Sequence, residues 1–559
     1  MDDNNRNDQT VSKTISPETN PDSVAQTPPV SGTSQAVVQH VGIRKNRKIV
    51  FFTATFLAVL AAGIVGLLIF PSSKSGESSK TNSVATKKAI DLIRIGDPAS
   101  KLDAVYPELG DPIGYETDIA KQIFEPLVRF KEINTVEPAL ASSWKNDPKN
   151  ENVWLFTIKD GVTFHNGTAL TPESIKLCIE AAKKNDFLSY FLDSLDAVSV
   201  VGKNQVKITT TSPDPLLLNK LTNILIYDTT AKIQPSTENG TGPYNVKQGT
   251  KPTEKSLDLV AVQNWHGGTV GTRELQFTVD SEDELNTAIE KGTLDLIFKG
   301  KTIDNLDAKG LKEYKLPQLT TSYIFMNTLK KASPLTNKEV RRAIAGVIDK
   351  DALIKASGVP GVKTDQIVTK EIPGYLPDYK APTVTIEEAK KILKDAGFTK
   401  AISLSAITVK ENTAVNLIAS DLAAQLAKIG INLTINPQEA DTAITEYNTA
   451  KYDLGLFSYA SDLIDLSDVV KSNFQKETAT TLSYDNPTVN DAMKKVNGTF
   501  DSSKRLKSLQ DVHKLLLDDV AVIPYRSPSE SFYVKKNIDL KADNSGYLGI
   551  NFWDTFQSQ

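Results

Sequence analysis

The most marked hydrophobic pattern of the chain is an uncharged run of 22 residues, Ile49–Phe70. At about 1.5 Å per helical residue, this run has the length that a hydrocarbon core of about 30 Å requires. A helix packed on a soluble core would show a polar face, and this run shows none. The pattern therefore predicts either a retained transmembrane helix or a cleaved signal peptide.

Length and flanking residues favour the retained helix, a signal-anchor. Apolar segments of signal peptides usually hold about 7–15 residues before a small-residue cleavage site, whereas the nearest such triplet, Ser83-Val84-Ala85, lies well beyond the run. The basic cluster Arg44–Lys48 precedes the run, so residues 1–48 are expected in the cytoplasm and the main domain outside the cell membrane. The polar residues 1–48 predict a disordered tail, and residues 71–88 predict a flexible tether.

Capping signals and helical periodicity mark helices in the remaining chain. Ser281-x-x-Glu284 and Thr385-x-x-Glu388 have the spacing of capping boxes, and we expect their helices to end near Gly292 and at Gly397. An apolar strand, Leu294–Phe298, is expected after the first of these helices.

Strand patterns indicate an α/β fold. Strand Ile402–Val409, helix Thr413–Ile429 and strand Ile431–Asn436 have the order of a βαβ unit, which pairs its strands in parallel, and Tyr452–Ala460 is a further buried strand. Residues 154–168 alternate instead, which predicts a hairpin with its turn at Asp160-Gly161. Hairpins early and βαβ units later indicate two lobes.

Charge and composition narrow the class of protein to which the chain can belong. The 559 residues hold 64 basic and 68 acidic side chains; residues 89–559 account for 54 and 62 of them, so a nucleic-acid partner is not expected. A disulfide framework is excluded by the single cysteine, Cys178, which we expect on the inner face of a helix as a small buried hydrophobe. Four scattered histidines give no metal-ligand spacing.

Catalytic motifs are not found in the sequence. It has no nucleophile elbow, H-E-x-x-H pair or Walker A loop. The glycine-rich Gly240–Tyr244 is expected to be a tight turn, and His165 a hydrogen-bonded turn residue. Asp462 and Asp465 follow a buried strand, where they could serve as a general acid/base pair, cap a helix or lie in a solvated loop. An enzyme is therefore not expected.

The order of these segments resembles the family-5 extracellular solute-binding proteins of ABC importers, the group with the oligopeptide- and dipeptide-binding receptors. The strongest match is Ile123–Ala182, which follows the family's motifs in order and at the right spacing. Later matches are Gly240–Tyr244 (GTGPY), Asn264–Gly268 (NWHGG), Lys291–Ile297 (KGTLDLI), Asn337–Asp349 (NKEVRRAIAGVID), Glu387–Gly397 (EEAKKILKDAG) and Leu417–Asn432 (LIASDLAAQLAKIGIN). The resemblance covers about 89–545. Unlike most Gram-positive members, the chain has no lipobox cysteine.

The resemblance implies a two-lobe, periplasmic-binding-protein-like fold of type II with an extra subdomain in lobe I. Lobe I would comprise 89–319 and 521–559, and lobe II 320–520. Hinge strands are expected near Leu319–Met326 and Val520–Arg526. Such a receptor closes its lobes on a ligand, here a peptide, and delivers it to an ABC permease. It would be monomeric, without a cofactor or a bound metal.

The same resemblance implies the residues that bind the ligand. Asp462 matches the aspartate that holds the ligand's α-ammonium group, with Asp465 three residues further on. Tyr459 stands where many members have a tryptophan. Lys410, at the end of strand Ile402–Val409, would hold the ligand's carboxylate, although a lysine offers a point charge where the family has an arginine; a solvated loop lysine is the other interpretation.

Two other classes of function stay open at this stage. The ligand could be a non-peptide solute such as an oligosaccharide, an opine or a chelated metal, the last being least favoured because histidines are few. The fold could also serve a surface hydrolase, an adhesin or a scaffold, since fold alone does not decide function.

Overall fold

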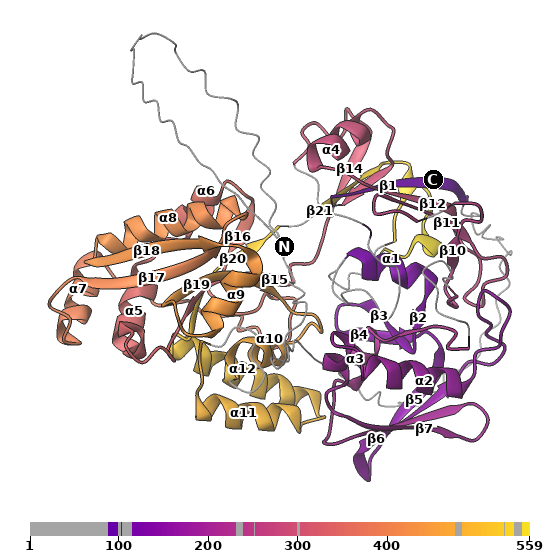
Figure 1. Ribbon diagram of the computed structural model, residues 1–559, viewed down its shortest axis with the longest axis horizontal. Coiled ribbons are helices and arrows are strands. Elements are labelled where there is room, and N and C mark those ends of the chain that lie inside the picture. Colours follow the sequence, from indigo (N-terminus) through magenta and orange to yellow (C-terminus); the bar gives the residue numbers. More distant parts are fainter. Residues whose placement is uncertain are drawn as a thin grey trace, which may run out of the picture. The chain divides into compact units, whose positions relative to one another are not determined.

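The computed structural model describes residues 88–98, 102, 115–230, 239–250, 252–298, 302–475, 483–529, 531–541 and 550–558 (Figure 1). The tail, the apolar run Ile49–Phe70 and all but the last residue of the tether lie outside them, and so those predictions are not addressed by the structure. Among the described helices, none is long and apolar enough to cross a bilayer.

The first lobe is built on a seven-stranded mixed sheet. Its centre is β1, a parallel neighbour of both β12 and β13. The strands in sheet order are β10 (Tyr244–Val246), β11 (Ser256–Ala261), β12 (Thr272–Val279), β1 (Ile90–Asp97), β13 (Leu296–Phe298), β21 (Ser531–Lys535) and β14 (Leu311–Lys315). Helix α4 (Glu282–Glu290) contacts β13 and begins at Ser281, whose hydroxyl accepts a hydrogen bond from the Glu284 N–H, as the sequence predicts.

A separate four-stranded sheet lies in the same half of the sequence. Its order is β5 (Ala141–Asp147), β6 (Asn150–Ile158), β8 (Gln205–Thr210) and β7 (Leu195–Val201), all antiparallel. Helix α2 (Pro172–Ala182) packs on this sheet and buries Cys178 on its inner face, which confirms the role predicted for that residue. The other helices of this half are α1 (Tyr115–Ile123), η1 (Leu188–Leu192) and α3 (Leu217–Leu221).

The hairpin predicted for residues 154–168 is wrong in its second strand. Asp160 and Gly161 do form a turn, and Gly161 has a φ of +76°. However, both edges of β6 are occupied, by β5 and β8, so the residues after the turn form only one isolated bridge, Thr163 to Ala169. His165 lies in this turn region, where its Nε2 is 3.0 Å from the carbonyl oxygen of Gly242, as expected of a hydrogen-bonded turn residue.

The second lobe is a six-stranded sheet with helices on both faces (Figure 1). Sheet order is β16 (Gly361–Lys363), β20 (Val522–Pro528), β15 (Thr320–Met326), β19 (Leu454–Ala460), β17 (Ile402–Val409) and β18 (Ile431–Gln438). Strands β17 and β18 pair in parallel across α8, which confirms the predicted βαβ unit. The helices are α5 (Lys338–Val347), α6 (Lys350–Ser357), α7 (Ile386–Asp395), α8 (Thr413–Ala427), α9 (Ala440–Asn448), α10 (Leu466–Phe474), α11 (Pro487–Asn497) and α12 (Ser502–Asp518).

The side chains of the central strand β15 point alternately to the two faces of the sheet, and the helices pack against these faces in two separate cores. Tyr323 and Phe325 of β15 pack with α9 to α12, whereas Ile324 and Met326 pack with α5 to α8. Because successive side chains of a strand point to opposite faces, a segment packed into apolar cores on both faces is apolar throughout, as Tyr323–Met326 is.

The chain passes between the two main sheets twice. It leaves the first sheet after β14, and it returns between Pro528 and Ser531, where β20 gives way to β21. Strands β15 and β20, which overlap the two predicted hinge strands, are neighbours in the second sheet. The predicted division placed the return at residue 521, ahead of β20 rather than after it.

Candidate ligand-binding site

The carboxyl ends of four strands, β17 to β20, lie at one edge of the second sheet. Strand β17 runs parallel to β19, and both β19 and β20 run antiparallel to β15, so β17, β19 and β20 share a direction. Ligands of α/β proteins bind at such an edge, because the loops that follow the strands present their polar groups there. The loop after β19 carries Asp462, and Lys410 directly follows β17.

The loop Ser461–Asp465 is stabilised by buried hydrogen bonds. The Ser461 hydroxyl accepts from the backbone N–H of Asp465 at 2.9 Å and lies 2.8 Å from Oδ2 of Asp468. Ile464 is buried with a φ of +58°, a conformation that β-branched residues rarely adopt. The surrounding contacts therefore offset a backbone strain on the order of 1–3 kcal/mol.

Asp465 is fully enclosed and has a structural set of partners. Its Oδ1 caps α10 by accepting from the Ser467 N–H at 2.8 Å, and its two oxygens lie 2.9 and 3.2 Å from the guanidinium nitrogens of Arg505 on α12. Burial raises the pKa of Asp465 to about 6, against the opposing charge of Arg505, and so the carboxyl is ionised at neutral pH. These contacts favour the helix-capping interpretation, and a ligand-binding role for Asp465 stays a prediction.

Asp468, which the sequence analysis did not single out, is the centre of the buried polar contacts. Its Oδ1 accepts from the hydroxyls of Tyr459 at 3.1 Å and Tyr190 at 3.4 Å, and its Oδ2 lies 2.8 Å from the Ser461 hydroxyl. Burial, followed by the nearby negative charge of Asp462, raises the pKa of Asp468 well above its ordinary value. Acidic residues are common in the first turn of a helix, where they interact favourably with the helix dipole. The sequence therefore gives no signal that distinguishes Asp468 as a site residue.

The structure brings Asp462 and Tyr459 together around Asp468. Tyr459 is half-buried, and its hydroxyl also lies 3.0 Å from Ser472 Oγ. Asp462 is half-buried, and both of its carboxylate oxygens are shielded from solvent. Burial raises the pKa of Tyr459 and of Tyr190, and the charges of Asp468 and Asp462 add to that shift. Asp462 and Asp468 are therefore two shielded carboxyl groups whose negative charges disfavour each other.

Lys410 has a different environment. Its side chain is 64% exposed and its Nζ lies 2.9 Å from Oε1 of Glu439, the residue that follows β18. Lys410 lies at the same sheet edge as the loop after β19. Its partner Glu439, however, follows β18, which lies on the other side of β17 from β19. The observed contacts are those of a solvated ion pair, and a role as carboxylate anchor stays a prediction.

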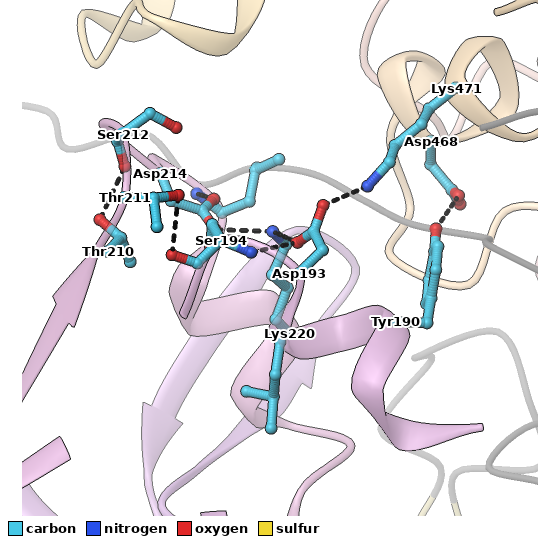
Figure 2. Close-up of polar contacts among 12 residues, drawn as sticks. Tyr190, Asp193, Ser194, Thr210, Thr211, Ser212, Asp214, Lys220, Asp468 and Lys471 are labelled. Atoms are coloured by element: carbon cyan, nitrogen blue, oxygen red, sulfur yellow. Dashed lines mark hydrogen bonds and ion pairs between the residues drawn. The ribbon is translucent and has the colours of Figure 1, made fainter. Parts of the chain in front are cut away.

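Residues of the first lobe reach this region. Figure 2 shows Tyr190 and Asp193, on and just after η1, facing Asp468 and Lys471 of α10. Lys471 forms an ion pair with Asp193, and its Nζ lies 5.2 Å from the ring centre of Tyr190. The loop after β19 is also bound from this side, because the Asn219 side-chain amide donates to the carbonyl oxygen of Leu463 at 3.1 Å.

A cofactor or metal finds no obvious donor set in this part of the molecule. Among the described residues, no group of three His, Cys, Asp or Glu side chains is placed to hold a metal ion. Acid/base chemistry at Asp465 is blocked by its bidentate pairing with Arg505. What the arrangement offers is buried carboxylate and hydroxyl oxygens, which suit a cationic group of a ligand.

Comparison with known proteins assigns the family. Residues 135–481 match the family model described as "Bacterial extracellular solute-binding proteins, family 5 Middle". The nickel-binding protein NikA of Staphylococcus aureus is 28% identical over 428 residues, which is 73% of this chain and 84% of that protein. The probable D,D-dipeptide-binding periplasmic protein DdpA of Escherichia coli is 25% identical over 468 residues, or 76% and 85% of the two chains.

Solved structures have the same fold. The periplasmic binding protein DppA of Helicobacter pylori, solved in complex with the peptide STSA, superposes with a TM-score of 0.70 at 18% identity and covers 84% of this chain and 99% of that one. The two-lobe, mixed α/β binding-protein fold implied by the sequence resemblance is thereby confirmed. The chain belongs to family 5 of the bacterial extracellular solute-binding proteins, and it is a non-enzymatic substrate-binding protein of an ABC importer.

Proposed function

We propose that the ligand is a peptide, held by its α-ammonium group at Asp462. The observation that carries this proposal is the pair of shielded carboxyl groups at the end of β19, Asp462 and Asp468, whose negative charges disfavour each other. The described hydrogen bonds of Asp468 come from hydroxyls and one backbone N–H. An ammonium group would compensate that charge with charge-assisted hydrogen bonds, each worth roughly 1.5–3 kcal/mol. The names of DdpA and of the DppA complex, which refer to peptides, also support it.

The opposite end of the peptide is assigned to Lys410. To bind a carboxylate, Lys410 must exchange Glu439 for the ligand, and because both side chains are exposed this exchange costs little. A peptide backbone between the two charged anchors would be bound without regard to its side chains.

The experiment compares peptides that differ only at their ends. Isothermal titration of the full chain in detergent uses one short peptide as the free zwitterion, as its N-acetyl form and as its C-terminal amide. Wild-type protein is expected to prefer the free amine, and Asp462→Asn is expected to lose about tenfold or more in affinity together with that preference, at nearly unchanged thermal stability. Lys410→Ala is expected to remove the preference for the free acid over the amide.

Asp491→Asn is the matched control, because Asp491 is an exposed aspartate whose ion-pair partner is Lys494 on the same helix. Equal affinity of wild-type protein for the free and acetylated peptides would contradict the role of Asp462. Binding of a nickel–histidine chelate with no binding of any peptide would contradict the peptide proposal and place the chain with NikA in ligand class.

Membrane attachment is part of the same proposal. We infer that Ile49–Phe70 stays on the protein as a single-pass anchor, with the N-terminus in the cytoplasm and the two lobes outside. The apolar length and the preceding basic cluster support it. Mass spectrometry of the protein from membranes should find peptides from residues 1–48 on the same chain as the lobes. A mature protein that begins between residues 71 and 90 would contradict the anchor.

A further inference from the structure

We propose that Tyr190 and Asp193 on the first lobe and Asp468 and Lys471 on the second form a latch, made of protein groups alone, that stabilises the closed receptor. Ligand binding by closure rests on the proposed function, whereas the latch itself is a set of contacts between the lobes. The latch shares Asp468 with the candidate ligand site, and it differs from the anchor at Asp462 because Lys471 and Asp193 bind each other.

The four residues match in spacing. Asp468 and Lys471 are three residues apart on α10, and therefore lie on one face of that helix. Tyr190 and Asp193 are also three residues apart, on and directly after the 3-10 turn η1, where residues at this spacing are aligned. As a result, the two pairs form together: the Tyr190 hydroxyl donates to Asp468 at 3.4 Å while Lys471 pairs with Asp193 (Figure 2).

In the first lobe, Asp193 of the latch is also paired with a second lysine, Lys220. Lys220 on α3 lies 2.7 Å from Asp193 and 2.6 Å from Asp214, and both Lys220 and Asp214 are about 5% exposed or less. Burial alone would raise the pKa of Asp193, but the charges of Lys220 and Lys471 hold it below its ordinary value, so Asp193 is ionised. On closure, Lys471 adds a second positively charged partner to Asp193.

Closure adds contacts that do not involve charge. Leu463, in the loop that presents Asp462, is buried in the apolar core of the first lobe, and its carbonyl oxygen accepts from Asn219. Lys471 and Asp193 are mostly shielded from solvent, at 15% and 25% exposure. A charge pair in such a place resists salt better than one on an open surface.

The latch has a defined effect on affinity. When only the closed form binds tightly, the apparent dissociation constant is the intrinsic constant divided by the closed fraction. Loss of the latch lowers that fraction, and it therefore weakens every ligand by the same factor, mainly through faster dissociation. Loss of Asp462, in contrast, weakens only ligands with a free amine.

The test is a double-mutant cycle in the full chain. Lys471→Met keeps most of the side-chain volume without its charge, Asp193→Asn removes the partner charge, and Lys494→Met, at an exposed lysine on α11, is the matched control. Backbone hydrogen exchange of residues 188–193 and 461–474 without ligand reports opening, and stopped-flow peptide dissociation reports the effect on binding.

We expect Lys471→Met to speed exchange in both segments together and to raise dissociation of the free and the acetylated peptide about tenfold each, with the double variant no worse than the stronger single one. The control should change neither. Unchanged exchange in both segments, or fully additive single effects, would overturn the latch. The exchange measurement needs no ligand, so failure of the peptide proposal leaves this test intact, and failure of the latch leaves the titrations with Asp462→Asn intact.

Discussion

At the scale of single residues, the pair formed by Asp465 and Arg505 fixes the geometry of the site. Arg505 is one of the largest fully buried side chains of the described residues, and it joins α12 to the first turn of α10. The backbone after β19 must turn sharply at Ile464 to reach this pair. The position of Asp462 is therefore set by an ion pair that lies behind it.

Arg505→Met tests this dependence. Removing one partner of a buried ion pair leaves an uncompensated charge, and typically costs about 3–5 kcal/mol. We expect a loss of that size in the free energy of unfolding, measured with urea, and a weaker peptide affinity because the loop loses its support. The double variant with Asp465→Asn should recover part of the stability, since no charge is then stranded. A loss below about 1 kcal/mol in the single variant would show that the pair does not hold the loop.

At the scale of elements, local signals predicted well what local contacts determine. The Thr385–Glu388 capping box is present at the start of α7, and Gly430, with a φ of +81°, follows α8 and precedes β18. The predicted hairpin after β6 was wrong because strand pairing is decided between distant segments: β8, some fifty residues later, occupies the edge that the hairpin would have used.

The same distinction between local signals and contacts of distant segments applies to the residues of the candidate site. The position of Asp462 could be predicted because it follows a buried strand whose pattern the sequence shows, whereas its ligand-binding role comes from the family resemblance and stays a prediction. Asp468 and Tyr190 could not, because they are 278 residues apart and meet only when the lobes are in place. Lys410 was placed correctly at the end of β17, but its pairing with Glu439 depends on the register between β17 and β18.

At the scale of the whole molecule, a buried histidine makes stability depend on pH. His513 on α12 is fully buried; its Nε2 accepts from the Ile367 N–H at 2.9 Å, so Nδ1 carries the proton and donates to the carbonyl oxygen of Gly374 at 2.9 Å. Burial lowers the pKa of His513 to about 4. A depressed pKa stabilises the folded state above the unfolded value of about 6.5, and this stabilisation is lost as the pH falls from there through 4.

Complete loss of the His513 stabilisation should lower the free energy of unfolding by about 3 kcal/mol, since each unit of pKa shift corresponds to roughly 1.4 kcal/mol. Asp465 has a raised pKa and acts in the opposite sense, because its contribution grows as the pH falls from about 6 toward its ordinary value. The comparison is therefore made between wild type and His513→Gln by urea unfolding at pH 7, 5.5 and 4. The stability advantage of wild type should shrink steadily with acid. If the difference in free energy of unfolding between the two proteins stayed constant with pH, groups other than His513 would be responsible for the loss of stability in acid.

The position of β20 and β21 has a consequence for how the protein is made. Strand β20 lies between β16 and β15, and β21 lies between β13 and β14, so the last strands of the two large sheets to be synthesised are interior ones. During synthesis, both sheets expose two unpaired edges until residues 522–535 arrive, and such edges invite aggregation. Neither sheet can be completed before these residues arrive, so the emerging chain must be kept apart from its neighbours until then.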